Sequence, residues 1–524
     1  MKDDKNVYVL KLYDTELLRF SMSYSSSLDP EIRLISTREK LKSLMPIGLE
    51  LSNEGLLKWL RRRTIPKNRR YVREVLGVLN LNEANVIDII KWSMGLSLND
   101  SYWVVPARFT GRFADYNLYT NPFSAALGVV ALTGQGQIDA SDTSSPELTT
   151  SGSLPKAWRR ENGDLFLYKG ATEGFANSGL EPYSEYYISQ LASALFQGDT
   201  RLYVPYDLKE YKDSVYSTCP IFTNIDTSYV CAGMVYPGGG IINVINEYES
   251  LSPSYGDSIR DMILLDALTN NEDRHFGNFG FLRDNHTGKI IGTAPVYDNG
   301  YGLFSRATDN DLKDLPSFLS NHPSHYGFLY SDLLDSVITD RQISMLNSVN
   351  GFTLTRHPAF NVSAERFSCL QAFLDERIAK FIKFTVKARD FYLTSLKNQI
   401  AISTPDVPDK FVDIPAKSSI GFDKCTVNTA TLASYENDGY TYVEFSLTEK
   451  AEEVFTDVFR EYEKHGIYGS LFELKYNKGT KEAVLTLVLN TRDGDFFVSD
   501  CFKDGDIRIC CNQISDRLPG YVDL

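Results

Sequence analysis

Apolar residues recur at helical spacing in the N-terminal part of the chain. Between residues 52 and 94 they return every three or four positions, and the pattern breaks near residues 64–66 and again near residues 80–82. Such spacing places apolar side chains along one face of a helix. We therefore expect three short helices in an N-terminal helical subdomain, to which we assign residues 1–133.

The character of the chain changes after this subdomain. Small polar residues dominate residues 139–146 and predict a mobile loop. Residues 156–160 and 165–169 then predict the two strands of a hairpin. A helix beginning near Pro182 follows, because proline suits the first turn of a helix. We expect residues 134–227 to form a small lobe.

The second half of the chain divides into a helical region and an appendage. Residues 228–400 are mainly helical in pattern, with two short strands predicted at 279–283 and 290–296. A cluster of prolines then indicates a linker. The segment 415–524 mixes alternating stretches with an amphipathic helix at 449–464, which predicts a small C-terminal α+β domain. The predicted fold class of the whole chain is α+β.

Composition places the chain among folded proteins. Its 524 residues are 43% hydrophobic and 23% charged, with a mean hydropathy of -0.24. The sequence has no run of about 18 apolar residues and no apolar leader, so we expect neither a membrane span nor standard export. The 7 cysteines form no CxxC pair and their number is odd, which argues against a zinc site and a disulfide framework. A reducing cytoplasm is the expected location.

The charge of the chain is acidic, with one basic exception. A net charge of -14 makes direct binding to nucleic acid unfavourable. The segment from Lys58 to Arg73, however, is rich in lysine and arginine. Two interpretations stay open: a solvated helix face whose stems cover apolar surface, or a surface for a phosphate-bearing or acidic partner.

Three polar residues in the middle of the chain have the spacing of a phosphoryl-transfer centre. In protein kinases the catalytic-loop Asp precedes a metal-binding Asn by five positions, and a second metal-binding Asp follows. Here Asp273 and Asn278 have that spacing, and Asp298 follows the two predicted strands. A polar turn that caps helices is the alternative, whereas an EF-hand loop is excluded because its ligand pattern is absent. The spacing favours phosphoryl transfer.

Two charged residues upstream fit the same centre. Lys169 ends a predicted strand, where a kinase needs an ammonium group against the nucleotide phosphates. Glu185 lies early on the next helix, where it can pair with Lys169. Each residue alone is typical of a protein surface. In this order, ahead of Asp273 and Asn278, they favour a two-lobed ATP site.

Two further segments would complete a nucleotide site. Residues 149–156, called here the phosphate-covering loop, would lie over the phosphates, although the single glycine makes this a weak motif and an ordinary turn is the alternative. The sequence contains no P-loop motif. Ile221 and Phe222 lie between the lobes, where backbone groups would read the adenine edge. A buried strand fits these two residue types equally well.

Together these motifs resemble the HipA-like serine/threonine kinases of bacterial toxin–antitoxin systems, over roughly residues 40–395. The matching elements are the Ser/Thr-x-x-Gly-x-x-Pro-Lys loop, Lys169, the helix of Glu185, the Asp-Arg-His-x-x-Asn string at 273–278 and the Pro-Val-Tyr-Asp string ending at Asp298. The Asp-Arg-His-x-x-Asn string also occurs in phosphoinositide kinases. The Pro-Lys loop distinguishes the two families.

The resemblance implies a two-lobed protein-kinase-like fold, ATP and Mg²⁺ as cofactors, and a bacterial cytoplasmic protein. It implies that Asp273 is the catalytic base and that Asn278 and Asp298 bind Mg²⁺. Lys169, paired with Glu185, would hold the phosphates. With the two hinge residues included, the expected ATP contacts are Ser151, Gly152, Ser153, Leu154, Pro155, Lys156, Lys169, Ile221, Phe222, His275, Asn278, Tyr297 and Asp298.

The resemblance also bears on substrates and regulation. Kinases of this family phosphorylate proteins and can phosphorylate a residue of their own phosphate-covering loop. By the family pattern that residue is Thr149, with Thr150, Ser151 and Ser153 as neighbouring candidates, and a phosphate there would repel ATP. A protein substrate and a small antitoxin-like partner are implied, and the sequence identifies neither.

Two other functions fit the same residues. A small-molecule or phosphoinositide-type kinase would use the same centre, and a pseudokinase would keep it as a nucleotide-binding module. The acidic charge and the lack of a membrane-binding amphipathic helix count against a lipid substrate. Every expected catalytic residue type is present, which disfavours a pseudokinase.

Overall fold

The computed structural model describes most of the chain up to residue 399 and a set of strands near the C-terminus. The described ranges are 6–26, 29–137, 145–174, 179–236, 240–326, 329–399, 433–437, 440–445, 467–477, 482–491, 494–503 and 506–514. The chain divides into two compact units, of which the first comprises Met1–Gly239, Leu251–Tyr326 and Gly351–Leu374. Every residue of the predicted site lies in this first unit. The four domain limits drawn from the sequence stay a prediction.

The first four strands of the chain form an antiparallel sheet with the strand order β3-β2-β1-β4. Along β2, the alternate residues Leu18, Phe20 and Met22 are buried, as expected of a sheet with one covered face. The bounds of the strands are β1 (Val7–Leu12), β2 (Thr15–Tyr24), β3 (Pro30–Thr37) and β4 (Tyr102–Pro106).

The three predicted helices of this subdomain are present, and the first and third of them cover the sheet. Ser52 caps the first of them by accepting a hydrogen bond from the Gly55 N–H at 2.9 Å. Buried residues of the sheet and of the first and third helices form one core, whereas those of the second helix belong to a core shared with the predicted hairpin. The subdomain is thus α+β rather than helical, because the alternation along β1 and β2 forms strands that the helical pattern did not reveal. The helices are α1 (Asn53–Arg62), α2 (Val72–Gly77) and α3 (Val86–Ser93).

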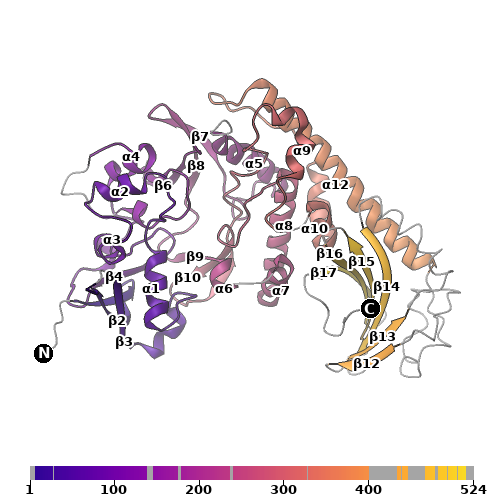
Figure 1. The fold of residues 1–524 in the computed structure, drawn as a ribbon, viewed down its shortest axis with the longest axis horizontal. Coiled ribbons are helices and arrows are strands. Elements are labelled where there is room, and N and C mark those ends of the chain that lie inside the picture. Colours follow the sequence, from indigo (N-terminus) through magenta and orange to yellow (C-terminus); the bar gives the residue numbers. More distant parts are fainter. Residues whose placement is uncertain are drawn as a thin grey trace. The chain divides into compact units, whose positions relative to one another are not determined.

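The predicted hairpin belongs to a second antiparallel sheet, ordered β5-β6-β8-β7. Helix α4 packs against β5, and α5 packs against β7 and β8 (Figure 1). Tyr187, Ile188 and Leu191 of α5 are fully buried. The end of β6 therefore lies beside the start of α5. The elements are α4 (Ala125–Thr133), β5 (Lys156–Glu161), β6 (Asp164–Lys169), α5 (Glu181–Leu195), β7 (Asp207–Tyr211) and β8 (Ser214–Pro220).

The rest of the first unit is built around α8 (Pro253–Thr269). The residues from Met262 to Thr269 are all buried, and the helix ends where Asn270 takes a left-handed conformation with φ 50°. The two predicted strands after it are present and pair with β9 in the order β11-β10-β9. The remaining elements are β9 (Thr227–Cys231), α6 (Ala232–Val235), β10 (Gly280–Asp284), β11 (Ile290–Thr293), α9 (Leu315–Ser320) and 3-10 helices at Glu39–Leu44, Phe113–Asp115, Pro146–Leu148 and Asp311–Asp314.

The second unit holds helices and an antiparallel sheet whose strands follow the order of the sequence, β12 to β17. The predicted linker and the amphipathic helix at 449–464 lie outside the described residues, as does most of the predicted loop at 139–146. The elements are α7 (Ile241–Leu251), α10 (Tyr330–Val337), α11 (Asp340–Ser348), most of α12 (Ala364–Gln399), β12 (Ala433–Asn437), β13 (Tyr440–Phe445), β14 (Ile467–Asn477), β15 (Glu482–Thr491), β16 (Gly494–Lys503) and β17 (Asp506–Ile514).

Helices and antiparallel sheets thus occur in both units, which confirms the predicted α+β class. Among the described helices, none combines the length and the apolar character needed to cross a bilayer.

Candidate active site

The pairing of Lys169 with Glu185 is the centre of the site. Lys169 Nζ lies 2.7 Å from Glu185 Oε1, and both side chains are buried. The second carboxylate oxygen of Glu185 accepts a hydrogen bond from the Asn299 N–H at 2.8 Å. Burial alone would lower the pKa of Lys169, but the carboxylates of Asp298 and Glu185 outweigh it and hold the pKa above its ordinary value. Lys169 therefore stays charged at neutral pH.

Asp298 reaches this pair from the segment after β11. Its carboxylate accepts a hydrogen bond from Lys169 Nζ. Its backbone is left-handed, with φ 58°, a conformation that Asp adopts more readily than most residues. Burial raises the pKa of Asp298, but Lys169 and Lys156 outweigh it and hold the pKa below its ordinary value. The carboxylate therefore stays charged beside Lys169 and Lys156.

Arg274 fixes the loop that carries the other catalytic candidates. Its side chain is fully buried, and its Nε and Nη2 atoms donate to the two carboxylate oxygens of Asp266 on α8, both at 2.9 Å. Its Nη1 atom donates to the backbone oxygen of Asn278 at 3.1 Å and also to that of Tyr297. One guanidinium group thus ties the catalytic loop and the Asp298 segment to the same helix.

Asp273 and Asn278 lie on the loop that Arg274 holds. Asn278 Nδ2 donates to the backbone oxygen of Asp273 at 2.9 Å, so the predicted pair is in direct contact. The Asp273 carboxylate is half-buried. Burial raises its pKa, the Asp298 charge adds to the rise, and His275 opposes it. A raised pKa makes this carboxylate a better proton acceptor.

The phosphate-covering loop presents Lys156 to the same place. Lys156 is buried and stands opposite Lys169 in the register of β5 and β6. Burial, with the nearby charges of Arg69 and Lys169, lowers the pKa of Lys156 to about 7. In the described part of the chain its ammonium group has no hydrogen-bonded acceptor, so an anion in the cleft would find it available.

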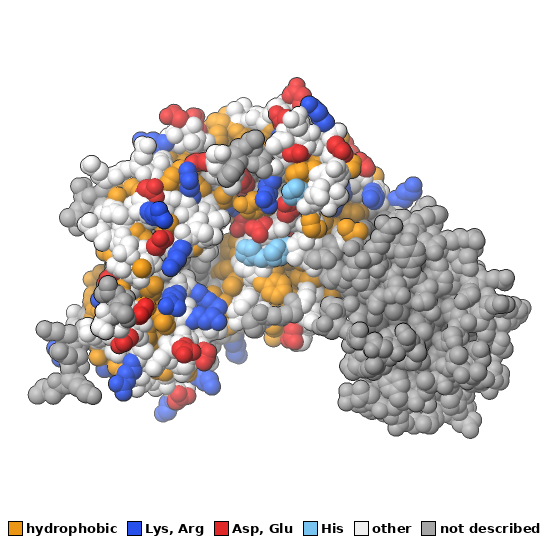
Figure 2. Space-filling view, in the orientation of Figure 1, with side chains coloured by type: hydrophobic (Ala, Val, Ile, Leu, Met, Phe, Trp, Pro, Cys, Tyr) orange, Lys and Arg blue, Asp and Glu red, His pale blue; other side chains and the backbone are white. Residues whose placement is uncertain are grey.

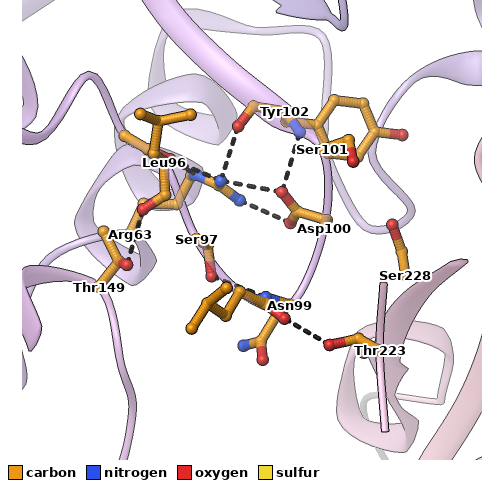
Figure 3. A network of polar contacts seen from close by, with 12 residues as sticks. Arg63, Leu96, Ser97, Asn99, Asp100, Ser101, Tyr102, Thr149, Thr223 and Ser228 are labelled. Atoms are coloured by element: carbon orange, nitrogen blue, oxygen red, sulfur yellow. Dashed lines mark hydrogen bonds and ion pairs between the residues drawn. The ribbon is translucent and has the colours of Figure 1, made fainter. Parts of the chain in front are cut away.

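A polar network anchors this loop and the hinge to the N-terminal subdomain (Figure 3). Arg63 is buried and lies 2.7 Å from Asp100, which fixes the segment 95–102. The Thr149 hydroxyl donates to the backbone oxygen of Leu96 at 2.7 Å, and the Thr223 hydroxyl donates to that of Leu98 at 2.5 Å. Thr149, the predicted autophosphorylation residue, is therefore buried and bonded in this conformation of the loop.

The two predicted hinge residues differ in their surroundings. Phe222 lines the cleft and packs against Tyr297 and Tyr229, with ring centroids at 5.3 and 5.6 Å. Ile221 instead packs with the core of the N-terminal subdomain, and its N–H donates to the Leu165 oxygen at 3.1 Å. The Ile221 amide is thus part of the sheet, which is the buried-strand alternative left open by the sequence.

A cleft of about 1320 Å³ brings the predicted residues together. It is lined by Asp273 and by the expected ATP contacts except Pro155 and Ile221, while Glu185 lies behind it against Lys169. Figure 2 shows histidine and acidic side chains beside each other at the centre of the described face, with lysine and arginine side chains nearby over the α1 region. The cleft is large enough for a nucleotide and part of a substrate.

Asn278 and Asp298 have the chemistry to hold Mg²⁺. The Asn278 amide nitrogen is bonded to the Asp273 backbone, which leaves the amide oxygen available. A carboxylate and an amide oxygen are hard ligands of the kind Mg²⁺ prefers, and phosphate oxygens and water usually complete its shell. Elsewhere, the described residues include no group of three or more His, Cys, Asp and Glu placed to bind a metal.

The basic segment 58–73 proves to be divided. Arg63 and Arg69 are buried and form internal bonds, which neither interpretation of the segment anticipated. Arg61, Arg62 and Lys67 are exposed and line the cleft. An acidic or phosphate-bearing partner therefore stays a prediction for these exposed residues only.

Asp266 and Arg274 are the functional residues that sequence reasoning missed. Arg274 was named only as part of the Asp-Arg-His-x-x-Asn string. Asp266, within the apolar end of a predicted helix, was given no role. The available signal was a carboxylate inside the run Leu264-Leu265-Asp266-Ala267-Leu268, because a buried charge needs a partner.

Comparisons with known proteins agree with the motifs. No protein-family model matches the chain. A curated relative, the serine/threonine-protein kinase CtkA of Helicobacter pylori strain J99, is 28% identical over 145 residues, which are 23% of this chain and 43% of that protein. The chain thus matches less than half the length of this relative. The resemblance to HipA-like kinases expected from the motifs is confirmed.

Two solved structures are similar to the chain. The Helicobacter pylori proinflammatory kinase CtkA has 19% sequence identity and a TM-score of 0.38, over 47% of this chain and 96% of that one. HipA of Shewanella oneidensis MR-1, in a complex with HipB and operator DNA, has 14% identity and a TM-score of 0.44, over 73% of this chain and 99% of that one.

Proposed function

We propose that this chain, which resembles the HipA-like serine/threonine kinases, is an ATP- and Mg²⁺-dependent serine/threonine protein kinase. The observation that carries the proposal is the buried Lys169, bonded to both Glu185 and Asp298 at a cleft that Asp273 also lines. In protein kinases the corresponding Lys–Glu pair and the metal-binding Asp must both be in place for phosphoryl transfer. The contacts among Lys169, Glu185 and Asp298 support this proposal.

Each part of the cleft has a role in this proposal. Lys156 and Lys169 would bind the phosphates, and the Phe222 and Tyr297 rings would contact the adenine. Mg²⁺ bound by Asn278 and Asp298 would neutralise the charge of the phosphates. The site would thus position the γ-phosphoryl group between these two lysines and the Asp273 carboxylate, which is the kind of positioning on which this reaction depends.

Asp273 would orient and deprotonate the attacking hydroxyl group. The hydroxyl oxygen forms a bond to the γ-phosphorus, the bond from that phosphorus to the oxygen of the departing ADP breaks, and the hydroxyl proton passes to Asp273. The raised pKa of Asp273 suits this role, because a base works best when its pKa approaches the working pH. Arg274 keeps the carboxylate in place through the backbone of its loop.

Autophosphorylation of the phosphate-covering loop is part of the proposal. Ser151 and Ser153 are exposed and line the cleft, whereas the Thr149 hydroxyl is buried against Leu96. Thr149 would accept a phosphate only after the loop leaves this conformation, so Ser151 and Ser153 are the acceptors that need least movement. A protein substrate, an antitoxin-like partner and a cytoplasmic setting complete the proposal.

Labelling with γ-³²P-ATP and Mg²⁺ tests the proposed function. The wild-type chain should label itself or an added protein, and Asp273→Asn should abolish the label. The matched control is Asp213→Asn, because Asp213 is exposed in the turn between β7 and β8. Label that persists in Asp273→Asn would show that the base is wrongly assigned. Label found only on added small molecules would favour the small-molecule kinase, and no Mg²⁺-dependent stabilisation by ATP would contradict the whole proposal.

A further inference from the structure

Arg69 connects the basic segment to the phosphate-covering loop. Its side chain is only 3% exposed, although it follows a run of exposed basic residues. Its Nε atom donates to the Gly152 oxygen at 2.6 Å, and its Nη2 atom donates to the oxygens of Thr150 and Ser151 at 2.6 and 2.7 Å. The next residue adds a backbone bond, from the Arg70 N–H to the Ser153 oxygen at 2.8 Å.

These bonds determine the direction of the peptide groups in the loop. In a trans peptide the C=O and N–H groups point in opposite directions. Since Arg69 binds three consecutive carbonyl groups, the N–H groups of Ser151, Gly152 and Ser153 point away from it. Within the described residues, these three N–H groups have no hydrogen-bond acceptor. Consecutive unpaired N–H groups form a concave site for anions, and this loop lines the cleft.

Gly152 allows the loop and Lys156 to approach each other. Its φ is +93°, a conformation that residues with a side chain rarely adopt, and a Cβ there would lie 2.2 Å from Lys156 Nζ. Two cations, Arg69 and Lys156, therefore lie close to one short stretch of backbone. Glu147, the carboxylate whose charge acts on Arg69, is bound instead by Ser145 and the Trp158 N–H. Nη1 of Arg69 is buried without an acceptor among the described residues.

We propose that Arg69 is a positioning residue for ATP: it holds the carbonyl groups of Thr150, Ser151 and Gly152 so that the loop presents its N–H groups to the triphosphate. Arg69 itself does not line the cleft, so it acts through the loop. The inference rests on the proposed function and extends it, because nucleotide affinity then depends on a residue of the N-terminal subdomain.

Limited proteolysis tests the holding of the loop without any nucleotide. Lys156, at the end of the loop, is buried in the wild-type chain, and trypsin cleaves after a lysine or an arginine only where the residue is accessible. Arg69→Gln should raise the rate of cleavage after Lys156 at least tenfold, as followed by mass spectrometry. Arg73→Gln is the matched control, because Arg73 belongs to the same basic segment but is exposed and does not line the cleft. An unchanged rate in Arg69→Gln would overturn the proposal.

Calorimetric binding of Mg-ATP and of adenosine tests the link to the phosphates. Arg69→Gln should weaken ATP at least tenfold and leave adenosine unchanged, since adenosine has no phosphates to meet the loop. Arg69→Lys keeps the charge but loses the forked geometry of the guanidinium group. Its affinity for ATP should therefore lie between those of the wild type and Arg69→Gln. Arg73→Gln should bind both ligands as the wild type does.

The outcomes separate this proposal from the kinase assignment. Equal ATP affinity in wild type and Arg69→Gln, or an equal loss of ATP and adenosine, would overturn the role of Arg69. A wild-type chain that binds neither ligand would instead contradict the proposed function, while the proteolysis result would still show whether Arg69 holds the loop. If Arg69→Gln does not fold, Arg69→Lys carries both measurements.

Discussion

The catalytic loop and the phosphate-covering loop are each held by one buried arginine, but the two arginines are balanced differently. Arg274 faces the carboxylate of Asp266, which outweighs the effect of burial and holds its pKa above the ordinary value. Arg69 binds backbone carbonyl groups, and burial lowers its pKa to about 10, with Glu147 as a weaker opposing charge. One loop is held by a compensated ion pair and the other by neutral acceptors.

This difference matches what each loop has to do. A catalytic carboxylate must stay in one geometry, because small displacements of reacting groups are costly in rate. A loop over the phosphates has to release the nucleotide. Its carbonyl groups can do so readily, because a carbonyl group that loses its hydrogen bond to an arginine can accept one from water instead. The comparison therefore predicts a rigid catalytic loop and a releasable phosphate-covering loop within one site.

Removing the two arginines should give the largest effects and tests the comparison directly. Arg274→Met leaves Asp266 buried without its main partner, and it should lower the free energy of unfolding by about 3–5 kcal/mol. Arg69→Met should cost about 1–3 kcal/mol, because its acceptors are neutral and can reach water when the loop opens. Urea denaturation followed by tryptophan fluorescence measures both values. Equal losses would mean that the two loops are held equally firmly.

Steady-state kinetics should separate the two loops by the parameter that changes. Asp273→Asn should lower kcat at least about 100-fold and change the KM for ATP little, because a general base contributes in the transition state. Lys156→Met should instead raise the KM for ATP roughly tenfold, the loss of one charge-assisted contact, and leave kcat within a few-fold. The opposite assignment of kcat and KM effects would contradict the division of roles.

The core of this site could be predicted because its residues follow one another in a fixed order. Lys169 at a strand end, Glu185 on the next helix and the Asp273 to Asn278 spacing each carry a weak signal, and the structure brings all of them to one cleft. The hairpin and α5 were predicted for a related reason. Their turn and proline signals are local, so they do not depend on distant contacts.

Features that depend on distant partners could not be predicted in the same way. Arg69 lies in a basic run, and such a run looks the same whether its members face water or carbonyl groups 81 and 82 residues away in the chain. The side on which Ile221 packs depends on the N-terminal sheet, which was not anticipated. Only Asp266 could have been recognised from the sequence, because it is a charged residue within the apolar end of a helix.

The pH dependence of activity tests the environment of the catalytic loop. Burial and the Asp298 charge raise the pKa of Asp273 above 3.8, its ordinary value, although His275 and His325 oppose the rise. The base must be ionised, so kcat/KM should fall as the pH falls through this raised pKa. A profile recorded from pH 8 down to pH 4, at constant ionic strength, should therefore show its acid limb above pH 3.8. A profile that shows no fall down to pH 4 would show that Asp273 is not desolvated.

The smallest expected effect is the uptake of a fraction of a proton when ATP binds, and it depends on the two lysines of the facing strands β5 and β6. Lys169 is paired with carboxylates and stays charged, whereas Lys156 has a pKa of about 7 and is mostly neutral at pH 8. Phosphates favour the ammonium form, so ATP binding at pH 8 should take up a proton at Lys156. Calorimetry in two buffers of different ionisation enthalpy measures this uptake, and Lys156→Met should remove it. Uptake that persists in Lys156→Met would place the proton on another group and show that Lys156 is already charged in the unbound loop.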